Sequence, residues 1–407
     1  DMTGDGVWPE MAHEIRENLL APFFEIDWKI HDISLKARDA ADDAALRAAI
    51  ADLKIHRAAV KGPTITPTQE EVEIYALKKK WPSPNGIIRD AVNGAAIFRT
   101  PISFEGLKIN APWMKNVTIA RQAVGGIYGA PNFALPGKGL LTITFQDEAT
   151  GEIKELAARN VNSGVGMLTT ETDSSIRDYA HAIFQQGLAM NKSVLFAAKE
   201  TINPAYDGRF HDILMDIFLT HYKADYDAQT LVFKDREANG SKVLIDAVAS
   251  KIPQGKLNGW IVALKNYDGD VMSDQVAGEH ISLGMMDSTL VSADGILLAD
   301  PPHGTAPDLE YAWHEQGILL ANPTAYIFAY AEAIRHKAEL NGQTEIALQA
   351  RMIKQAVIKT LAAGHLTGDL TRDNPLNGQQ FIAKVRETMA AMLAPAPAVN
   401  SAPEPAA

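Results

Sequence analysis

The sequence KNYDGDVMSD, residues 265–274, decides the interpretation of this chain of 407 residues. It follows the apolar run WIVAL (260–264), which is short, continuous and β-rich, as buried strands are. A helix beginning directly after that strand would place Asp270 and Asp274, four residues apart, on one face. Two carboxylates beside a strand end suit Mg²⁺ or Mn²⁺, with positions left for water and a chelating substrate. A solvated acidic helix start fits the same spacing, so the pattern alone leaves both interpretations open.

Composition narrows the classes of partner. A net charge of −12 at pH 7 and a pI near 5.4 argue against nucleic acid or an anionic membrane surface. No stretch approaches the length of about twenty apolar residues that a membrane-spanning helix needs. The absence of cysteine excludes disulfides and thiolate metal ligands, and it fits a reducing compartment. We therefore expect a cytoplasmic protein, in the bacterial cytosol or alternatively in the mitochondrial matrix.

Hydrophobic periodicity predicts an α/β fold. Short β-rich runs alternate with helical patterns up to about residue 100, which is typical of parallel strands joined by helices. Helices are predicted at residues 44–53, 68–80, 323–336, 343–363 and 378–392. Segment 127–172 differs, because Gly and Pro punctuate it and two strand-like runs, 140–145 and 152–156, flank a turn. This predicts an antiparallel insertion that could serve as an arm exchanged between subunits.

Three arginines follow one another in the first third of the chain. Arg99 and Arg121 each follow an apolar β-rich run, so both are predicted near strand ends, where α/β sheets bind ligands. Arg89 follows a turn that carries Ser83 and Asn85. Arginines among hydroxyl and amide groups match a substrate with several carboxylates. Any one of these arginines taken alone is more often a surface charge.

A set of short motifs occurs in a fixed order along the chain. They are TITP (64–67), SPNGIIR (83–89), FR (98–99), Arg121, YDGRF (206–210), KNYDGD (265–270), SD (273–274), LGMM (283–286), HGT (303–305) and NP (322–323). Over residues 1 to about 393 the set resembles the homodimeric, eukaryotic-type isocitrate dehydrogenases of the metal-dependent β-decarboxylating dehydrogenase superfamily. That family's first strand begins ahead of Asp1, so we expect native residues to precede it.

The resemblance implies a large Rossmann-like domain (1–92 and 281–393) and a smaller α/β sandwich domain (93–126 and 173–280). It also implies that 127–172 is an antiparallel clasp used in dimerisation. Residues 394–407, rich in Pro and Ala, are expected to form a disordered tail.

The resemblance also implies the site residues. Isocitrate would be bound by Thr66, Ser83, Asn85, Arg89, Arg99 and Arg121, and acid–base catalysis would fall to Tyr128 and Lys199. The metal, Mg²⁺ or Mn²⁺, would be held by Asp246, Asp270 and Asp274. The nicotinamide nucleotide would contact Thr64, Thr66, His303, Gly304, Thr305, Asp308 and Asn322. Lys199 and Asp246 would come from the neighbouring subunit, so that a homodimer shares its active sites.

These residue types suit the oxidative decarboxylation of isocitrate to 2-oxoglutarate and CO₂. A base takes the hydroxyl proton while hydride leaves C2, and an acid protonates the enolate that remains after loss of CO₂. A divalent metal stabilises the charge that develops on oxygen. A desolvated lysine near a metal can have its pKa lowered enough to act in the acid–base steps.

Residues at two places in the chain, after the His-Gly-Thr motif and after the Thr-Ile-Thr-Pro turn, predict NAD as the hydride acceptor. Most NADP-using relatives carry Arg-His after His-Gly-Thr and another arginine after the Thr-Ile-Thr-Pro turn, where this chain has Asp308, Leu309 and Glu71. A carboxylate accepts hydrogen bonds from a free ribose 2′-hydroxyl but repels a 2′-phosphate. Alternatively, Asp308 only caps a helix that begins at Leu309.

Other functions remain open on the sequence alone. The same reaction with NADP is the first alternative. Oxidation of another 3-carboxy-2-hydroxy acid, such as isopropylmalate or homoisocitrate, is the second. A non-catalytic metal-binding or assembly protein is disfavoured, because Tyr128 and Lys199 are both present.

Overall fold

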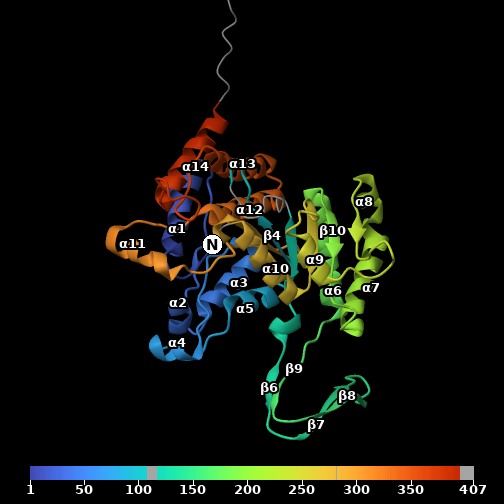
Figure 1. Ribbon diagram of the computed structural model, residues 1–407. Coiled ribbons are helices and arrows are strands. Elements are labelled where there is room, and N and C mark those ends of the chain that lie inside the picture. Colours follow the sequence, from blue (N-terminus) through green and yellow to red (C-terminus); the bar gives the residue numbers. More distant parts are fainter. Residues whose placement is uncertain (108–116, 281, 395–407) are drawn as a thin grey trace, which may run out of the picture.

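The computed structural model describes residues 1–107, 117–280 and 282–394, and a mixed sheet of eight strands forms its centre (Figure 1). The order across the sheet is β11-β10-β12-β5-β4-β13-β14-β3. The bounds are β3 (Ala58–Val60), β4 (Gly94–Pro101), β5 (Thr118–Gln122), β10 (Ser193–Phe196), β11 (Phe233–Lys234), β12 (Trp260–Leu264), β13 (Met286–Ser292) and β14 (Leu297–Ala299). A short parallel pair, β1 (Met2–Thr3) with β2 (His31–Asp32), adjoins the β3 edge of this sheet through an isolated bridge between Met2 and Lys61.

The strand directions differ from the expectation of parallel strands through residue 100. The β11-β10-β12-β5 half is parallel, and so is the edge pair β14-β3. By contrast, β4 and β13 run antiparallel to each of their neighbours. The prediction was therefore wrong for β4, because an apolar run signals burial without specifying strand direction.

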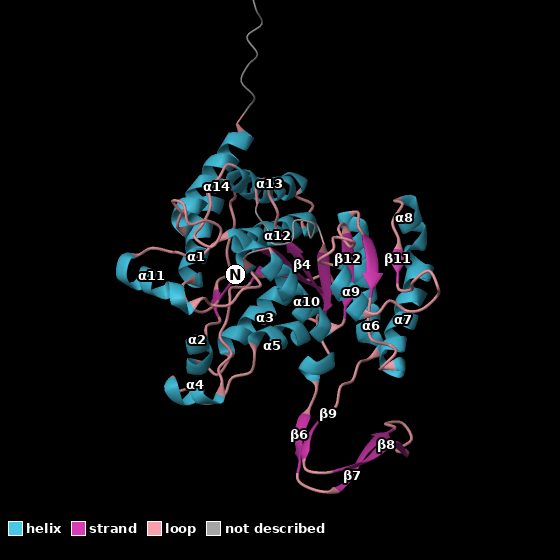
Figure 2. Cartoon of the chain, viewed as in Figure 1, coloured by secondary structure: helices cyan, strands magenta, loops and turns pink. Residues whose placement is uncertain are grey.

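Helices cover both faces of the sheet (Figure 2). They are α1 (Trp8–Glu14), α2 (Leu35–Ala40), α3 (Ala44–His56), α4 (Gln69–Ile74), α5 (Pro84–Ala91), α6 (Asp173–Met190), α7 (Pro204–Ile217), α8 (Lys223–Ala228), α9 (Ile245–Lys251), α10 (Asn266–Glu279), α11 (Glu310–Gln316), α12 (Thr324–Leu340), α13 (Thr344–Ala362) and α14 (Gly378–Leu393). Helices α6 and α12 pack on one face, through Phe98 and Leu297 of the sheet. Helices α5 and α10 pack on the other, which we call the α10 face, through Ile97 and Ile119. The α/β class is confirmed.

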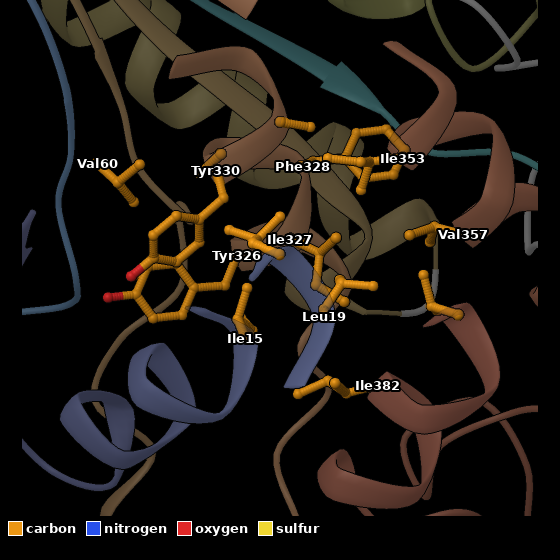
Figure 3. Close-up of a cluster of buried hydrophobic side chains, with 14 of the residues drawn as sticks. Ile15, Leu19, Val60, Tyr326, Ile327, Phe328, Tyr330, Ile353, Val357 and Ile382 are labelled. Carbon is orange, nitrogen blue, oxygen red and sulfur yellow. The ribbon is translucent and has the colours of Figure 1, made fainter. Parts of the chain in front are cut away.

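The largest core surrounds α12 (Figure 3). This helix is buried over most of its circumference, and its Tyr326, Ile327 and Phe328 lie between the sheet and a layer of helices. Helix α1 continues into a π-helical turn, η1 (Ile15–Leu20), which packs against α14. The first half of α12 is apolar on all sides and so needs a buried position, which the sheet and α13 supply.

The insertion projects away from the body (Figure 1). It contains two antiparallel pairs, β6 (Asn132–Leu135) with β9 (Gly164–Met167), and β7 (Gly139–Gln146) with β8 (Ile153–Val161). Antiparallel pairing is as predicted, and the arm exposes apolar side chains, including Leu140, Ile153 and Val165. Its use in dimerisation, like the domain boundaries, stays a prediction.

The predicted helices agree with the structure except for one. The pattern over 68–80 yields only α4, because Ala76 adopts a left-handed backbone conformation (φ 50°) and α4 buries no side chain. Of the expected tail, residues 395–407 lie outside the described residues. Among the described helices, none combines the length and the apolar character needed to cross a bilayer.

Candidate functional site

Arg99 and Arg121 lie side by side on the α10 face. The antiparallel register of β4 and β5 pairs Arg99 with Ile119 and Ile97 with Arg121. Because alternate residues of a strand share a face, both guanidinium groups point to the face that carries Ile97 and Ile119. Both arginines are buried. The sequence placed them near strand ends, and each lies within the last residues of its strand.

Helix α10 brings two carboxylates onto these arginines. Asp270 and Asp274 lie one turn apart, as their spacing predicted, and Arg99 Nη1 contacts Oδ1 of both, at 3.4 Å and 2.9 Å. Arg121 Nη1 also forms an ion pair with Asp270. Burial raises the pKa of Asp274, against the opposing effect of Arg99. The α10 face therefore holds alternating positive and negative groups in a small volume.

A third arginine approaches from α5. Arg89 lies in the last turn of this helix, close enough to Arg99 and Asp270 to interact with both electrostatically. Burial lowers the pKa of Arg89. Ser83 and Asn85 lie at the start of the same helix, and the Ser83 side chain makes no capping hydrogen bond there. One helix thus carries three of the six predicted substrate residues.

Arg99 and Arg121 each have a buried N–H group that no described residue accepts from. Within the described residues, Arg99 Nε and Arg121 Nη2 are buried N–H groups without a hydrogen-bond partner. Burial lowers the pKa of Arg121 to about 10, and the like charge of Arg89 adds to this effect. A buried donor without a partner costs free energy, so this pair favours an incoming anion such as a carboxylate.

Tyr128 meets the same cluster from the base of the insertion. It lies in a 3-10 turn, η3 (Gly126–Gly129), and its hydroxyl donates a hydrogen bond to Asp270 Oδ2. The guanidinium of Arg121 lies 4.7 Å from the centre of its ring. Burial and then the bond to Asp270 raise the pKa of Tyr128, so the phenol is held in its protonated form.

Lys199 and Asp246 form a separate pair. Lys199 Nζ lies 2.8 Å from Asp246 Oδ2, and this bond lowers the pKa of Asp246. The two residues follow β10 and begin α9, which lie on the β10 side of the sheet. In the contacts of the described residues, neither residue bonds to Asp270 or Asp274.

The donor set fits a divalent cation only in part. Asp270 and Asp274 supply two carboxylates one helical turn apart, and oxygen ligands are what Mg²⁺ and Mn²⁺ prefer. In residues 1–107, 117–280 and 282–394, however, no three His, Cys, Asp or Glu side chains gather as a metal site. The third predicted ligand, Asp246, is engaged with Lys199 instead. That a neighbouring subunit supplies Asp246 to the metal stays a prediction.

The predicted nucleotide loop lies against α1. The rings of His303 and Trp8 contact each other in a tilted arrangement with centroids 4.2 Å apart, and Trp8 Nε1 donates to the carbonyl of Thr305 at 3.0 Å. Burial lowers the pKa of His303 to about 4, so its imidazole is neutral. Gly304, between them, is exposed. The loop is therefore held by its backbone and by one ring contact.

Asp308 has no capping role. It is exposed in a short turn, η6 (Pro307–Leu309), and neither that turn nor α11 receives a side-chain cap. The helix-cap interpretation is therefore wrong. Glu71, by contrast, has a local role, because it forms a capping box with Thr68 at the start of α4. Glu71 therefore supports the prediction of NAD less strongly than Asp308 does.

The other residues predicted to contact the nucleotide differ in their exposure and in their hydrogen bonds. Thr66 is exposed, and Thr64 Oγ1 is a buried atom without a hydrogen-bond partner among the described residues. Asn322 is already engaged, since its Nδ2 donates to Asp369 at 3.0 Å and its Oδ1 accepts from the Thr324 backbone at 2.9 Å.

Sequence reasoning missed four residues that organise the site. Asn266 bonds to Arg121, Asp207 accepts from the backbone N–H of Lys199, Glu171 packs beside Tyr128's turn, and Asp369 holds Asn322. Asp207 and Asn266 lie in the motifs YDGRF and KNYDGD, which was the available signal. Nothing in the sequence distinguishes Glu171 or Asp369 from surface acids.

Comparison with known proteins gives consistent results. The family model described as isocitrate/isopropylmalate dehydrogenase matches residues 1–385. The mitochondrial NADP isocitrate dehydrogenase of Homo sapiens is 36% identical over 375 residues, covering 91% of this chain and 80% of the human protein. The Rattus norvegicus protein of the same name gives the same identity and coverage. The crystal structure of isocitrate dehydrogenase from Ostreococcus tauri, in complex with isocitrate and magnesium(II), superposes with a TM-score of 0.82 at 28% identity, covering 95% of this chain and 98% of that one.

Proposed function

The chain belongs to the isocitrate/isopropylmalate dehydrogenase family, and we propose that it is a homodimeric, NAD-dependent isocitrate dehydrogenase. The reaction is an oxidative decarboxylation that converts isocitrate to 2-oxoglutarate and CO₂. The observation that carries the choice of substrate is the arrangement of Arg89, Arg99 and Arg121. Two of these buried arginines keep an unpartnered N–H group beside the carboxylates of α10. Three cationic groups around one small volume suit a tricarboxylate better than a dicarboxylate.

The chain's own residues account for the handling of substrate and protons. Arg99 and Arg121 orient the carboxylates of isocitrate, while Ser83 and Asn85 at the start of α5 offer hydroxyl and amide groups to the third. The Tyr128 phenol, protonated through burial and its bond to Asp270, is suited to deliver a proton to the enolate carbon. Lys199 serves in the other proton transfer.

Asp270 and Asp274 would hold Mg²⁺ or Mn²⁺, with Asp246 of a second subunit as the third protein ligand. When bound, such a cation supplies a Lewis acid that stabilises negative charge on the substrate oxygen. Asp270 and Asp274 contact Arg99 and Arg121 in this structure. If these carboxylates held a cation, the two arginines would be available to the carboxylates of isocitrate.

The homodimer is supported by the Lys199–Asp246 pair and by the insertion. Both residues assigned to a neighbouring subunit lie together, away from the contacts of Asp270. The insertion exposes apolar side chains on strands with few contacts to the body, as an arm that embraces a partner does. The composition without cysteine supports a cytoplasmic location, with the mitochondrial matrix as the alternative, since that compartment appears in the names of the curated relatives.

NAD is proposed because of Asp308. Its carboxylate is exposed, caps no helix and follows the nucleotide loop directly, where it would repel a 2′-phosphate. NADP is the second candidate, because the curated relatives that match over most of this chain are named for it. Comparing kcat/KM for NAD and NADP with isocitrate and Mn²⁺ tests the proposal. A higher kcat/KM for NADP would remove the argument from Asp308.

The substrate has its own test. Isocitrate, isopropylmalate and homoisocitrate are compared at saturating Mn²⁺ with the preferred nucleotide. We expect the highest kcat/KM for isocitrate. Turnover of isopropylmalate without turnover of isocitrate would contradict the assignment of the three arginines.

A further inference from the structure

Asn266 connects three parts of the site through a single side-chain amide. It is the first residue of α10 and is 2% exposed. Its Oδ1 accepts a hydrogen bond from Arg121 Nε at 2.8 Å, and its Nδ2 donates to the carbonyl of Gly125 at 3.0 Å. One amide therefore links the carboxylate-bearing helix, a substrate arginine and the turn that precedes Tyr128.

The first bond fixes the orientation of Arg121. A guanidinium is planar, so its free edge is set once two of its nitrogens are held. In Arg121, Nε is held by Asn266 and Nη1 by Asp270, while Nη2 is the buried atom without a partner. Helix α10 can approach Arg121 this closely because of Gly269, where a Cβ would lie 2.7 Å from the Arg121 Cβ. The available donor thus points where Asn266 and Asp270 direct it.

The second bond fixes the turn that carries Tyr128. Gly125 and Gly126 have φ values of +75° and +62°, which are accessible to glycine at little cost but strained for other residues. The two glycines have no side chains that could hold this part of the turn in place. Asn266 binds its Gly125 carbonyl, while Glu171 packs against Gly125 and is itself held by Gln122 Nε2 at 3.0 Å.

We propose that Asn266 is a positioning residue that couples the orientation of Arg121 to the placement of Tyr128. The inference rests on the proposed function, since it assigns Arg121 to substrate binding and Tyr128 to proton transfer. In this role Asn266 acts through Arg121 and through the turn before Tyr128. It acts because a single planar amide presents its acceptor to one residue and its donor to the other, which no other side chain of the same size does.

The test is a double-mutant cycle on isocitrate binding. Asn266→Ala, Arg121→Lys and the double variant are compared by calorimetry with isocitrate in the presence of Mg²⁺. Lysine lacks the Nε–H that Asn266 receives, so the two substitutions break the same bond from opposite ends. Asn266→Ala is expected to raise the Kd for isocitrate by about tenfold or more. The double variant should bind only slightly more weakly than Arg121→Lys alone.

Steady-state kinetics separate positioning from general destabilisation. Asn266→Ala should lower kcat and raise the KM for isocitrate, while the KM for the nucleotide stays unchanged. Asn258→Ala, at an exposed position, is the matched control and should leave all three values unchanged. Should Asn266→Ala fail to fold, Asn266→Ser replaces it in the same cycle, because a hydroxyl can still bond to one of the two groups but not bridge both.

The outcomes distinguish this inference from the function on which it rests. If the wild-type protein neither binds nor oxidises isocitrate, the proposed function fails. If the wild-type protein does both, but the effects of the two substitutions on Kd add independently or Asn266→Ala binds isocitrate normally, the coupling role of Asn266 is wrong and the proposed function stands.

Discussion

Lys199 Nζ lies 2.8 Å from the carboxylate of Asp246, so two residues assigned to one active site contact each other rather than the aspartates of α10. The backbone of Lys199 is held in place, because its N–H donates to the carboxylate of the buried Asp207 at 2.8 Å. Asp207 also accepts from Lys265 Nζ at 2.8 Å, at the end of the strand that precedes α10. This arrangement suits a pair that is presented outward to a second copy of the chain.

Subunit complementation follows from that arrangement. Lys199→Ala and Arg121→Ala should each inactivate the homodimer. After mixing and reassociation, a heterodimer contains one site with both residues intact, so we expect activity to return to about a quarter of the wild-type value. Differently tagged copies of Lys199→Ala, mixed in the same way, are the control. Heterodimers that are demonstrably present but inactive would show that Lys199 does not act across an interface.

Nucleotide preference should respond to Asp308. Asp308→Asn removes the negative charge while keeping the size of the side chain, so repulsion of a 2′-phosphate falls. We expect kcat/KM for NADP to rise by roughly tenfold while that for NAD falls only a few-fold, as one surface charge pair predicts. Asp373→Asn, another exposed aspartate, should change neither value. An unchanged NADP/NAD ratio in Asp308→Asn would exclude this residue from the nucleotide site.

The turn before Tyr128 should tolerate no side chain at Gly125. Its φ of +75° strains any other residue, and a methyl group there would overlap the Glu171 carboxylate. Gly125→Ala is therefore expected to lower kcat by at least about tenfold through displacement of Tyr128. Gly137→Ala, at an open position of the insertion, is the matched control. Wild-type kcat in Gly125→Ala would mean that the turn does not position the tyrosine.

Stability at low pH should depend on Glu332. Burial raises its pKa, but Lys354 and Arg335 outweigh burial and lower the pKa of Glu332 to about 2. A lowered pKa means that the stabilisation is present above the unfolded value, near 4.5, and is lost as the pH falls toward 2. Glu332→Gln should destabilise the protein by about 3 kcal/mol at pH 7, because it leaves buried cations short of a partner.

Denaturant unfolding across a pH series measures this effect. The difference between wild type and Glu332→Gln should shrink steadily below about pH 4.5. Glu315→Gln, an exposed glutamate, should follow the wild-type curve throughout. A difference that persists unchanged at acid pH would show that the charge of Glu332 is not what stabilises the fold.

Much of this architecture is predictable because local pattern determines it. The run 260–264 is a strand and α10 begins at Asn266, as the apolar run and the acidic segment after it indicated. Arg99 and Arg121 were found because each follows an apolar run that could only be a strand. That both arginines point to one face of the sheet follows from the register of β4 against β5, which the sequence alone does not specify.

The features that the sequence did not predict depend on contacts between distant segments. The antiparallel direction of β4 is set by its pairing with β5 and β13, and no local pattern encodes it. Asp207 and Lys265 are 58 positions apart in sequence. A buried carboxylate in such a pair looks, in sequence, like any solvated acid at a helix start. The helix predicted over 68–80 ended early because α4 buries no side chain, so tertiary packing does little to stabilise a longer helix there.

The insertion begins beside Tyr128 and returns to the body beside Glu171, so both of its stems end at the turn that holds the tyrosine. In the proposed dimer, contacts made by the arm would therefore affect the turn that carries Tyr128, the proposed proton donor. Dissociation into single chains would then abolish activity in two ways. The neighbour's Lys199 would be lost from the site, and the chain's own Tyr128 would be held less firmly. An enzyme built this way would lose turnover on dilution in proportion to the loss of intact dimers.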